Sequence, residues 1–131
     1  MIVIDTHIWI WYLDKPDLLS EKSFAVVEHA KERKAIYISS ISVWEICVLE
    51  KNGRLQFSIP AAQWIRKSEN LSFLHFVPVT NEIVRRSVAL SGDLHPDPAD
   101  RMIIATACMK RIPLVTKDRK IQTYPAISTI W

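Results

Sequence analysis

The chain has 131 residues, of which 49% are hydrophobic and 24% are charged, and its formal net charge is +3. This length suits one domain with a full hydrophobic core, and we expect residues 1–131 to form a single domain. No apolar run approaches the length of a membrane span, and no basic region precedes the first apolar residues as in a signal peptide, so we expect a cytoplasmic protein. The small positive charge permits a nucleic-acid partner without requiring one.

Glycine and cysteine usage excludes several kinds of site. The only glycines, Gly53 and Gly92, are too few for a Walker loop or a dinucleotide fingerprint. Cys47 and Cys108 fall inside predicted helices, and we interpret them as packed free thiols because there is no Cys-x-x-Cys pair. No serine stands in a nucleophile pattern, which disfavours acyl transfer. Any chemistry on phosphates must therefore use side chains and metal ions.

The chain begins with a continuously apolar segment over residues 1–4, which is typical of a strand buried on both faces of a parallel sheet. Asp5 follows at the carboxyl end of this strand, where ligands gather in open α/β sheets. Asp5 or Thr6 would cap an aromatic helix over residues 7–13. Because this helix is apolar on nearly every side, we expect the core or a second chain to cover it.

A helix over residues 20–34, with Phe24 and Val27 on its apolar stripe, leads to a second strand over residues 35–39. Helices over residues 42–51 and 60–70 come next. Ser42 and Glu45 have the spacing of a capping box. Glu45 also lies just past the carboxyl end of a strand, as Asp5 does, so capping and a place in a site both stay open for it.

The second half repeats the alternation, with strands predicted over residues 75–79, 113–116 and 126–131. The helix over residues 80–90 should turn Ile83, Val84 and Val88 inward. A loop over residues 91–97 leads to a buried helix that starts at Pro98.

Two acidic residues stand at the start of that buried helix, and one follows the fourth strand. Asp97 suits the N-cap position and Pro98 the first helical position. Asp100 falls in the first turn, where it either only complements the helix dipole or belongs to a site. Asp118 directly follows the strand over residues 113–116.

The alternation of strands and helices predicts a three-layer α/β/α fold with a central, mainly parallel sheet of about five strands. Asp5, Glu45, Asp100 and Asp118 would then share one rim. Carboxylates crowded in this way repel one another unless a divalent cation binds them. Oxygen ligands favour Mg²⁺ or Mn²⁺ over zinc, and such ions support phosphodiester hydrolysis.

Four segments resemble the acidic motifs of PIN domains, and more narrowly those of VapC-type toxins of bacterial toxin–antitoxin pairs. They are MIVIDTH at residues 1–7, SVWEI at 42–46, DPADRMIIATA at 97–107 and LVTKD at 114–118. The resemblance covers the whole chain, and the third motif is the most specific. It implies a PIN-like fold, magnesium-dependent endoribonuclease activity, a homodimer and a cognate antitoxin protein.

The resemblance places Asp5, Glu45, Asp100 and Asp118 in the acidic cluster as catalytic residues and metal ligands. Asp5 and Asp100 are the best matches to the metal ligands of the family, whereas the match at Asp118 is looser. Secondary candidates are Asp97, which we interpret mainly as the helix cap, Thr6 and Arg101, for which we favour a surface role over steering of phosphate.

Other residues have both a structural and a functional interpretation. His7 lies beside Asp5, where it either touches substrate or packs, and we expect His95 to be an exposed loop residue. We interpret four tryptophans as core or interface residues rather than base-stacking platforms: Trp9, Trp11, Trp44 and Trp64.

We therefore expect a magnesium-dependent endoribonuclease that acts as a toxin on RNA, with Mn²⁺ as a substitute ion. One alternative is a phosphotransfer domain on a similar sheet. Such a site requires a second acidic residue two positions after Asp5, and His7 occupies that position. The other is a catalytically silent RNA- or partner-binding module. The helices over residues 8–13 and 43–49 carry more apolar surface than one small domain covers, which predicts a symmetric dimer with an antitoxin contact nearby.

Overall fold

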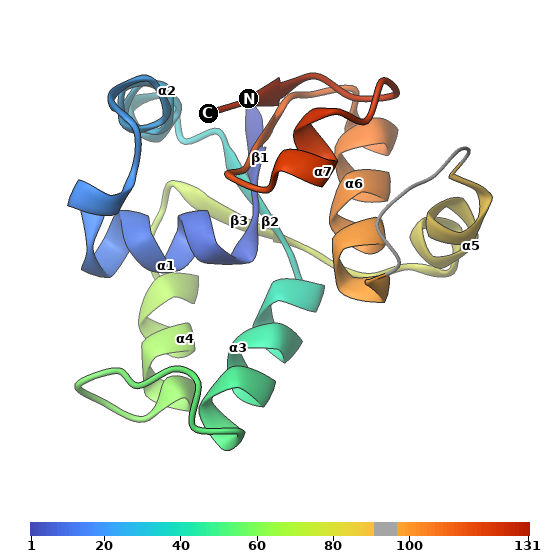
Figure 1. Cartoon of the computed structure of the whole chain (residues 1–131). Helices are drawn as coiled ribbons and strands as arrows, with labels where there is room; N and C mark the ends of the chain where they lie inside the picture. Colours follow the sequence, from blue (N-terminus) through green and yellow to red (C-terminus); the bar gives the residue numbers. More distant parts are fainter. Residues whose placement is uncertain (91–96) are drawn as a thin grey trace.

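The computed structural model describes residues 1–90 and 97–131. Five parallel strands form one sheet in the order β3-β2-β1-β4-β5. The predicted three-layer α/β/α fold is therefore confirmed (Figure 1). In chain order the elements are β1 (Ile2–Ile4), α1 (Thr6–Asp14), η1 (Pro16–Leu18), α2 (Glu21–Glu32), β2 (Ile36–Ser39), α3 (Ile41–Lys51), α4 (Ala61–Glu69), β3 (Leu74–Val77), α5 (Asn81–Ala89), α6 (Pro98–Lys110), β4 (Leu114–Val115), α7 (Arg119–Gln122) and β5 (Thr129–Ile130).

Two hydrophobic clusters lie on opposite faces of the sheet, because successive side chains of a strand point to opposite faces. Ile2 and Ile4 join the first cluster, which includes side chains of α1, α2 and α4. Val3 joins the second cluster, with side chains of α6 and α7. The strands are thus covered on both sides, as their continuous apolar sequences predicted.

The aromatic helix α1 is covered by the core. Trp9 is fully buried, its ring centroid lies 5.0 Å from that of Trp64 and 5.4 Å from that of Phe76, and its Nε1 donates to Oγ of Ser68 at 3.2 Å. The core interpretation of Trp9 and Trp64 is confirmed. The expectation that α1 carries more apolar surface than the domain covers is wrong for most of this helix, since Ile8, Trp9, Ile10 and Tyr12 are all buried.

The structure decides between the two interpretations left open for Glu45. The helix α3 begins at Ile41, and its N-cap residue, Ser40, makes no side-chain capping bond. Ser42 is buried inside the first turn and not at the N-cap, so Ser42 and Glu45 form no capping box. The helix starts one residue earlier than predicted, so Glu45 is its fifth residue and lies beyond the capping positions.

Several surface predictions also change. On α5 the buried stripe runs through Ile83 and Ser87, whereas Val84 and Val88 are 39% and 75% exposed. On α2, Val27 is buried but Phe24 is exposed. The inward orientations expected for Val84, Val88 and Phe24 are therefore wrong.

The remaining differences concern cysteines and short elements. Both cysteines are free, but Cys47 is exposed rather than packed and Cys108 is only half-buried. The strand predicted over 75–79 begins one residue earlier and ends at Val77, and the strands predicted over 113–116 and 126–131 shorten to β4 and β5. The helices η1 and α7 were not predicted. The expectation for His95 lies outside the described residues. Within those residues, no helix combines the length and apolarity that crossing a membrane requires.

The parallel sheet sets the position of the site. The carboxyl ends of β1, β2 and β4 lie at one edge of the sheet, and α1, α3 and α7 start just beyond them. Asp5, Glu45 and Asp118 therefore come from three separate parts of the chain to the same edge, where α6 adds its own N-terminus.

Candidate acidic active site

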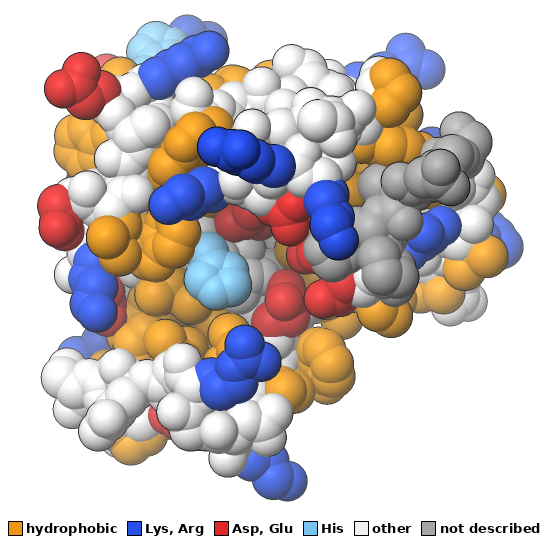
Figure 2. All heavy atoms as spheres, viewed as in Figure 1, with side chains coloured by type: hydrophobic (Ala, Val, Ile, Leu, Met, Phe, Trp, Pro, Cys, Tyr) orange, Lys and Arg blue, Asp and Glu red, His pale blue; other side chains and the backbone are white. Residues whose placement is uncertain are grey.

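A cleft of about 440 Å³ opens at the carboxyl edge of the sheet. Figure 2 shows acidic side chains gathered in a hollow of this face, with a histidine beside them and Lys and Arg side chains nearby. The described residues that line the cleft are Asp5, Thr6, His7, Trp11, Glu45, Asp97, Asp100, Lys117 and Asp118. The structure thus brings together all four predicted cluster residues, and Asp97 and Thr6 with them.

Asp5 is held by hydrogen bonds to both of its carboxylate oxygens. Its Oδ1 accepts from the Ile8 N–H at 3.0 Å, which caps α1, and its Oδ2 accepts from the hydroxyl of Thr116. Burial raises the pKa of Asp5, although both hydrogen bonds oppose that shift. Asp5 therefore sits in a fixed orientation in surroundings that disfavour its charged form.

Glu45 is tied to the first turn of α1. The hydroxyl of buried Thr6 donates to Oε1 of Glu45 at 2.6 Å, and Oγ1 of Thr6 also lies 2.8 Å from Oγ of Ser42. Burial raises the pKa of Glu45, and the charges of Asp97 and Asp5 raise it further against the Thr6 hydrogen bond. The side chain is thus a cleft residue rather than a helix cap.

The N-terminus of α6 contributes two carboxylates. Oδ1 of Asp97 accepts from the Ala99 N–H at 2.8 Å, which confirms the predicted cap. One carboxylate oxygen from each of Glu45, Asp97 and Asp100 lies within 4.8 Å of the other two. Burial, followed by the charges of Asp97 and Glu45, raises the pKa of Asp100 to about 7. Asp97 therefore both caps the helix and belongs to a group of three facing carboxylates.

Asp118 is the N-cap of the unpredicted helix α7. Its Oδ1 accepts from the N–H groups of Lys120 and Ile121 at 2.8 and 3.3 Å, and its own N–H donates to Oγ1 of Thr116 at 3.1 Å. Its charge raises the pKa of both Asp5 and Asp100. The cleft thus receives capping carboxylates at the N-termini of α1, α6 and α7, where the positive ends of the helix dipoles favour negative charge.

Carboxylate oxygens this close, with raised pKa values, are suited to a divalent cation. The facing group of Glu45, Asp97 and Asp100 offers only oxygen donors. Oxygen ligands suit Mg²⁺ and Mn²⁺ rather than zinc. A bound cation would offset both the burial and the mutual repulsion that raise these pKa values, so the donor set fits such an ion.

The PIN domain family matches residues 2–127, which include every carboxylate of the cleft. The chain belongs to the PIN domain family. This PIN domain is 32% identical to Ribonuclease VapC22 of Mycobacterium tuberculosis over 132 residues, which cover 99% of this chain and 98% of that relative.

Solved structures share the fold of this PIN domain at lower identity. A toxin-antitoxin complex from Klebsiella pneumoniae superposes with a TM-score of 0.65 at 21% identity, covering 100% of this chain and 97% of the other. VapBC2 from Rickettsia felis, bound to a DNA fragment from its promoter, superposes with a TM-score of 0.68 at 19% identity, covering 99% of this chain and 98% of the other. FitAcB from Neisseria gonorrhoeae superposes with a TM-score of 0.70 at 16% identity, covering 100% of this chain and 97% of the other.

Arg101 of this PIN domain does not line the cleft. Its Nε donates to the carbonyl of Ser87 at 3.0 Å, and its Nη2 lies 3.5 Å from the carbonyl of Leu90. These carbonyls belong to the last turn of α5 and its C-cap. The half-buried side chain therefore joins α5 to α6.

Sequence reasoning missed Lys117, which lines the cleft beside His7 and Trp11. Nζ of Lys117 lies 5.6 Å from the ring centroid of Trp11 and 5.7 Å from that of Trp131. The rings of His7 and Trp11 are 5.7 Å apart. Trp11 and Trp131 are separated by 120 positions in the sequence, and no local pattern indicates that their rings meet at 6.4 Å.

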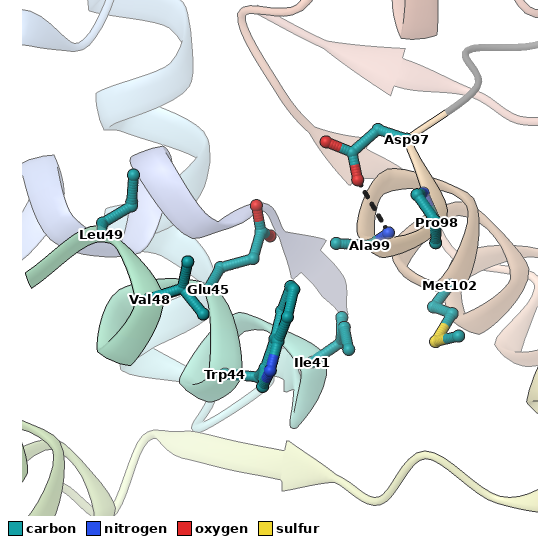
Figure 3. A pocket seen from close by; sticks show the side chains of 9 residues that line it. All are labelled: Ile41, Trp44, Glu45, Val48, Leu49, Asp97, Pro98, Ala99 and Met102. Atoms are coloured by element: carbon teal, nitrogen blue, oxygen red, sulfur yellow. Dashed lines mark hydrogen bonds between the residues drawn. The ribbon is translucent and has the colours of Figure 1, made fainter. Parts of the chain in front are cut away.

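An apolar groove of about 800 Å³ adjoins the acidic cleft and shares Glu45 and Asp97 with it. Figure 3 shows its side chains, which come from α3 and the start of α6. Trp44 projects from α3 into this groove and is 58% exposed. The expectation of excess apolar surface is thus confirmed for α3, on the side that faces α6.

Proposed function

We propose that this chain is the ribonuclease toxin of a toxin–antitoxin pair and that it hydrolyses RNA phosphodiester bonds with a divalent cation, normally Mg²⁺. One observation carries the proposal: a PIN domain, 32% identical to a ribonuclease, gathers five carboxylates in a single cleft. Family membership also removes the basis for the phosphotransfer alternative.

Asp5, Glu45, Asp100 and Asp118 are proposed to hold the cation, and Asp97 joins them through its contact with Glu45 and Asp100. When bound, Mg²⁺ supplies an activated water and stabilises charge on the leaving oxygen. Mn²⁺ is expected to substitute because it takes the same oxygen ligands.

The residues around these carboxylates would orient them. Thr116 and the Ile8 N–H fix Asp5, and Thr6 fixes Glu45. Hydrogen bonds of this kind hold ligands in place and favour their charged, metal-binding form. The N-termini of α1, α6 and α7 partly compensate the negative charge before any ion binds.

The partners proposed are an RNA substrate, a cognate antitoxin protein and a second copy of the chain. The similar structure from Klebsiella pneumoniae is a toxin-antitoxin complex, which supports an antitoxin for this chain. The exposed Trp44 in the apolar groove supports a protein contact on α3, since a monomer rarely leaves a large aromatic side chain open in an apolar groove.

The direct test is RNA cleavage by the purified chain with Mg²⁺, with Mn²⁺ and with EDTA. We expect cleavage with either ion and none with EDTA, and an Asp100→Asn variant purified in parallel controls for contaminating nucleases. Cleavage that survives exhaustive chelation would overturn the metal mechanism. RNA binding without cleavage under any of these conditions would support the alternative of a catalytically silent binding module.

A further inference from the structure

One wall of the acidic cleft is built from aromatic and cationic side chains. His7 and Trp11 come from α1, and Lys117 comes from the connection between β4 and α7. Trp131, which follows β5, does not line the cleft but lies next to Trp11 and Lys117. His7 and Lys117 are exposed, while the two indoles are half-buried. Nothing in the metal chemistry of the carboxylates requires such a wall.

The positions of these side chains are fixed by their neighbours. His7 and Trp11 are four residues apart on α1, so they share one face of a helix whose other faces are buried. Lys117 stands between Thr116 and Asp118, whose backbone and side chains are hydrogen-bonded to each other and to Asp5. Its ammonium lies over the Trp11 and Trp131 rings, a favourable cation–π arrangement.

RNA is a polyanion and needs positive charge next to an acidic cleft. Among the described residues that line the cleft, Lys117 is the one lysine or arginine. Single-stranded RNA is bound by cations along its backbone and by aromatic or histidine rings that stack on its bases. Lys117 and His7 provide one group of each kind beside the carboxylates.

The same wall continues into a second groove that shares His7 and Trp11 with the acidic cleft. This groove adds two exposed cations, Lys15 and Arg54, one carboxylate, Asp14, and the ring of Phe57. The apolar groove on the other side, by contrast, has no lysine or arginine among the described residues that line it. Charge therefore favours the α1 side as the route of an RNA strand.

We propose that Lys117 binds a backbone phosphate next to the cleaved bond, that a nucleobase stacks on His7, and that single-stranded RNA leaves the cleft along α1 toward Arg54. This assignment rests on the proposed ribonuclease function and adds the groups that position the substrate. His7 and Lys117 are positioning residues for the RNA, and neither is assigned a proton transfer.

The test is steady-state cleavage of a short, single-stranded fluorogenic oligoribonucleotide at several salt concentrations. Lys117→Gln should lower kcat/KM about tenfold, mainly through a higher KM, since an exposed phosphate contact contributes binding more than chemistry. The salt dependence should become shallower by about 0.7, the slope of one phosphate contact on a single strand. The matched control, Lys120→Gln, removes an exposed lysine of α7 that does not line the cleft and should match the parent.

Two substitutions separate stacking from acid–base chemistry at His7. His7→Ala should weaken RNA binding about tenfold with an unchanged salt slope, as loss of one base stack does. His7→Phe, which keeps a ring and loses both nitrogens, should stay near the parent. Loss of cleavage in His7→Phe as large as in His7→Ala would overturn the stacking role.

The remaining outcomes keep this inference distinct from the proposed function. All variants should keep the parent's Mg²⁺-induced rise in melting temperature, because none removes a carboxylate. A parent that does not cleave RNA defeats the proposed function before any variant is compared. A parent that cleaves, with Lys117→Gln indistinguishable from Lys120→Gln, leaves that function standing and overturns this inference. Normal cleavage combined with lost antitoxin binding in Lys117→Gln would assign the wall to a protein partner and overturn it as well.

Discussion

The hydroxyl of Thr6 donates a 2.6 Å hydrogen bond to Oε1 of Glu45 and so joins the first turn of α1 to α3. Thr6 is only 2% exposed, whereas Glu45 is half-buried at the cleft. The bond opposes the burial that raises the pKa of Glu45. Thr6 is therefore a positioning residue for one of the proposed metal ligands.

Thr6→Val should lower the Mg²⁺ affinity of the carboxylate site, because it removes the hydroxyl and keeps the shape of the side chain. Loss of this part-buried hydrogen bond should lower the free energy of unfolding by about 1 kcal/mol. Removal of a group that orients a metal ligand should reduce Mg²⁺ affinity and RNA cleavage by roughly 10–100-fold. A Mg²⁺ titration and a cleavage assay check this, with Thr6→Ser as the control that keeps the hydroxyl. Full Mg²⁺ affinity in Thr6→Val would remove the positioning role.

Arg101→Met should affect stability more than catalysis. The guanidinium contacts the carbonyls of Ser87 and Leu90, and hydrogen bonds from a charged donor contribute roughly 1.5–3 kcal/mol. Denaturant unfolding should show most of that loss, while cleavage per folded molecule changes by less than about tenfold. Arg85→Met, at an exposed position of α5, is the matched control and should leave stability near the parent value. Unchanged stability with a large loss of RNA binding would return Arg101 to phosphate steering.

The metal-free protein should lose stability as the pH rises. Burial and neighbouring carboxylates raise the pKa of Asp100 from 3.8 to about 7, so the folded chain keeps a proton that the unfolded chain has lost. The stabilising effect is complete below about pH 4 and disappears between about pH 4 and pH 7. The pKa values of Asp5 and Glu45 are also raised by burial, so both groups act on stability in the same direction.

Melting temperatures in EDTA at about pH 5 and pH 8 test this linkage. We expect a lower melting temperature at the higher pH, and a smaller difference for Asp100→Asn, which cannot ionise. Saturating Mg²⁺ should remove most of the difference because it binds the charged form. An equal change in melting temperature with pH in the parent and in Asp100→Asn would contradict the raised pKa of Asp100.

The place of the site was predictable because it depends on local signals. Short apolar strands are visible as uninterrupted runs; Asp5 directly follows β1, and Asp118 comes soon after β4. In a parallel sheet such residues must share an edge. The capping position of Asp97 was equally visible, because Pro98 marks the first turn of α6.

Contacts between distant segments were not predictable. Ser42 and Glu45 have a capping-box spacing, but α3 begins at Ile41, one residue earlier than predicted, and buries Ser42. Lys117 lies over Trp131 because β4 and β5 are neighbours in the sheet, which no local pattern reveals. The helix α7 is only four residues long, too short for a periodic signal.

Trp44 should support assembly of the chain. We expect a symmetric dimer at micromolar concentration, since an open apolar groove on one chain can be covered by a second copy. Trp44→Glu should shift the chain to a monomer by light scattering and leave the fold intact, because this side chain is 58% exposed. Leu18→Lys, at an exposed apolar position of η1, should remain dimeric. A monomeric parent, or a dimeric Trp44→Glu, would contradict this prediction.

The most direct test of the carboxylate site is the thermal melt of Asp100→Asn with and without Mg²⁺, beside an RNA cleavage assay. Removal of one crowded charge should let the variant melt at or above the parent temperature in EDTA. It should lose most of the rise in melting temperature that Mg²⁺ gives the parent, since that rise follows affinity, and its RNA cleavage should fall by orders of magnitude. A variant that melts lower in EDTA, still responds to Mg²⁺ and still cleaves RNA would make Asp100 a helix-end carboxylate and contradict the metal site.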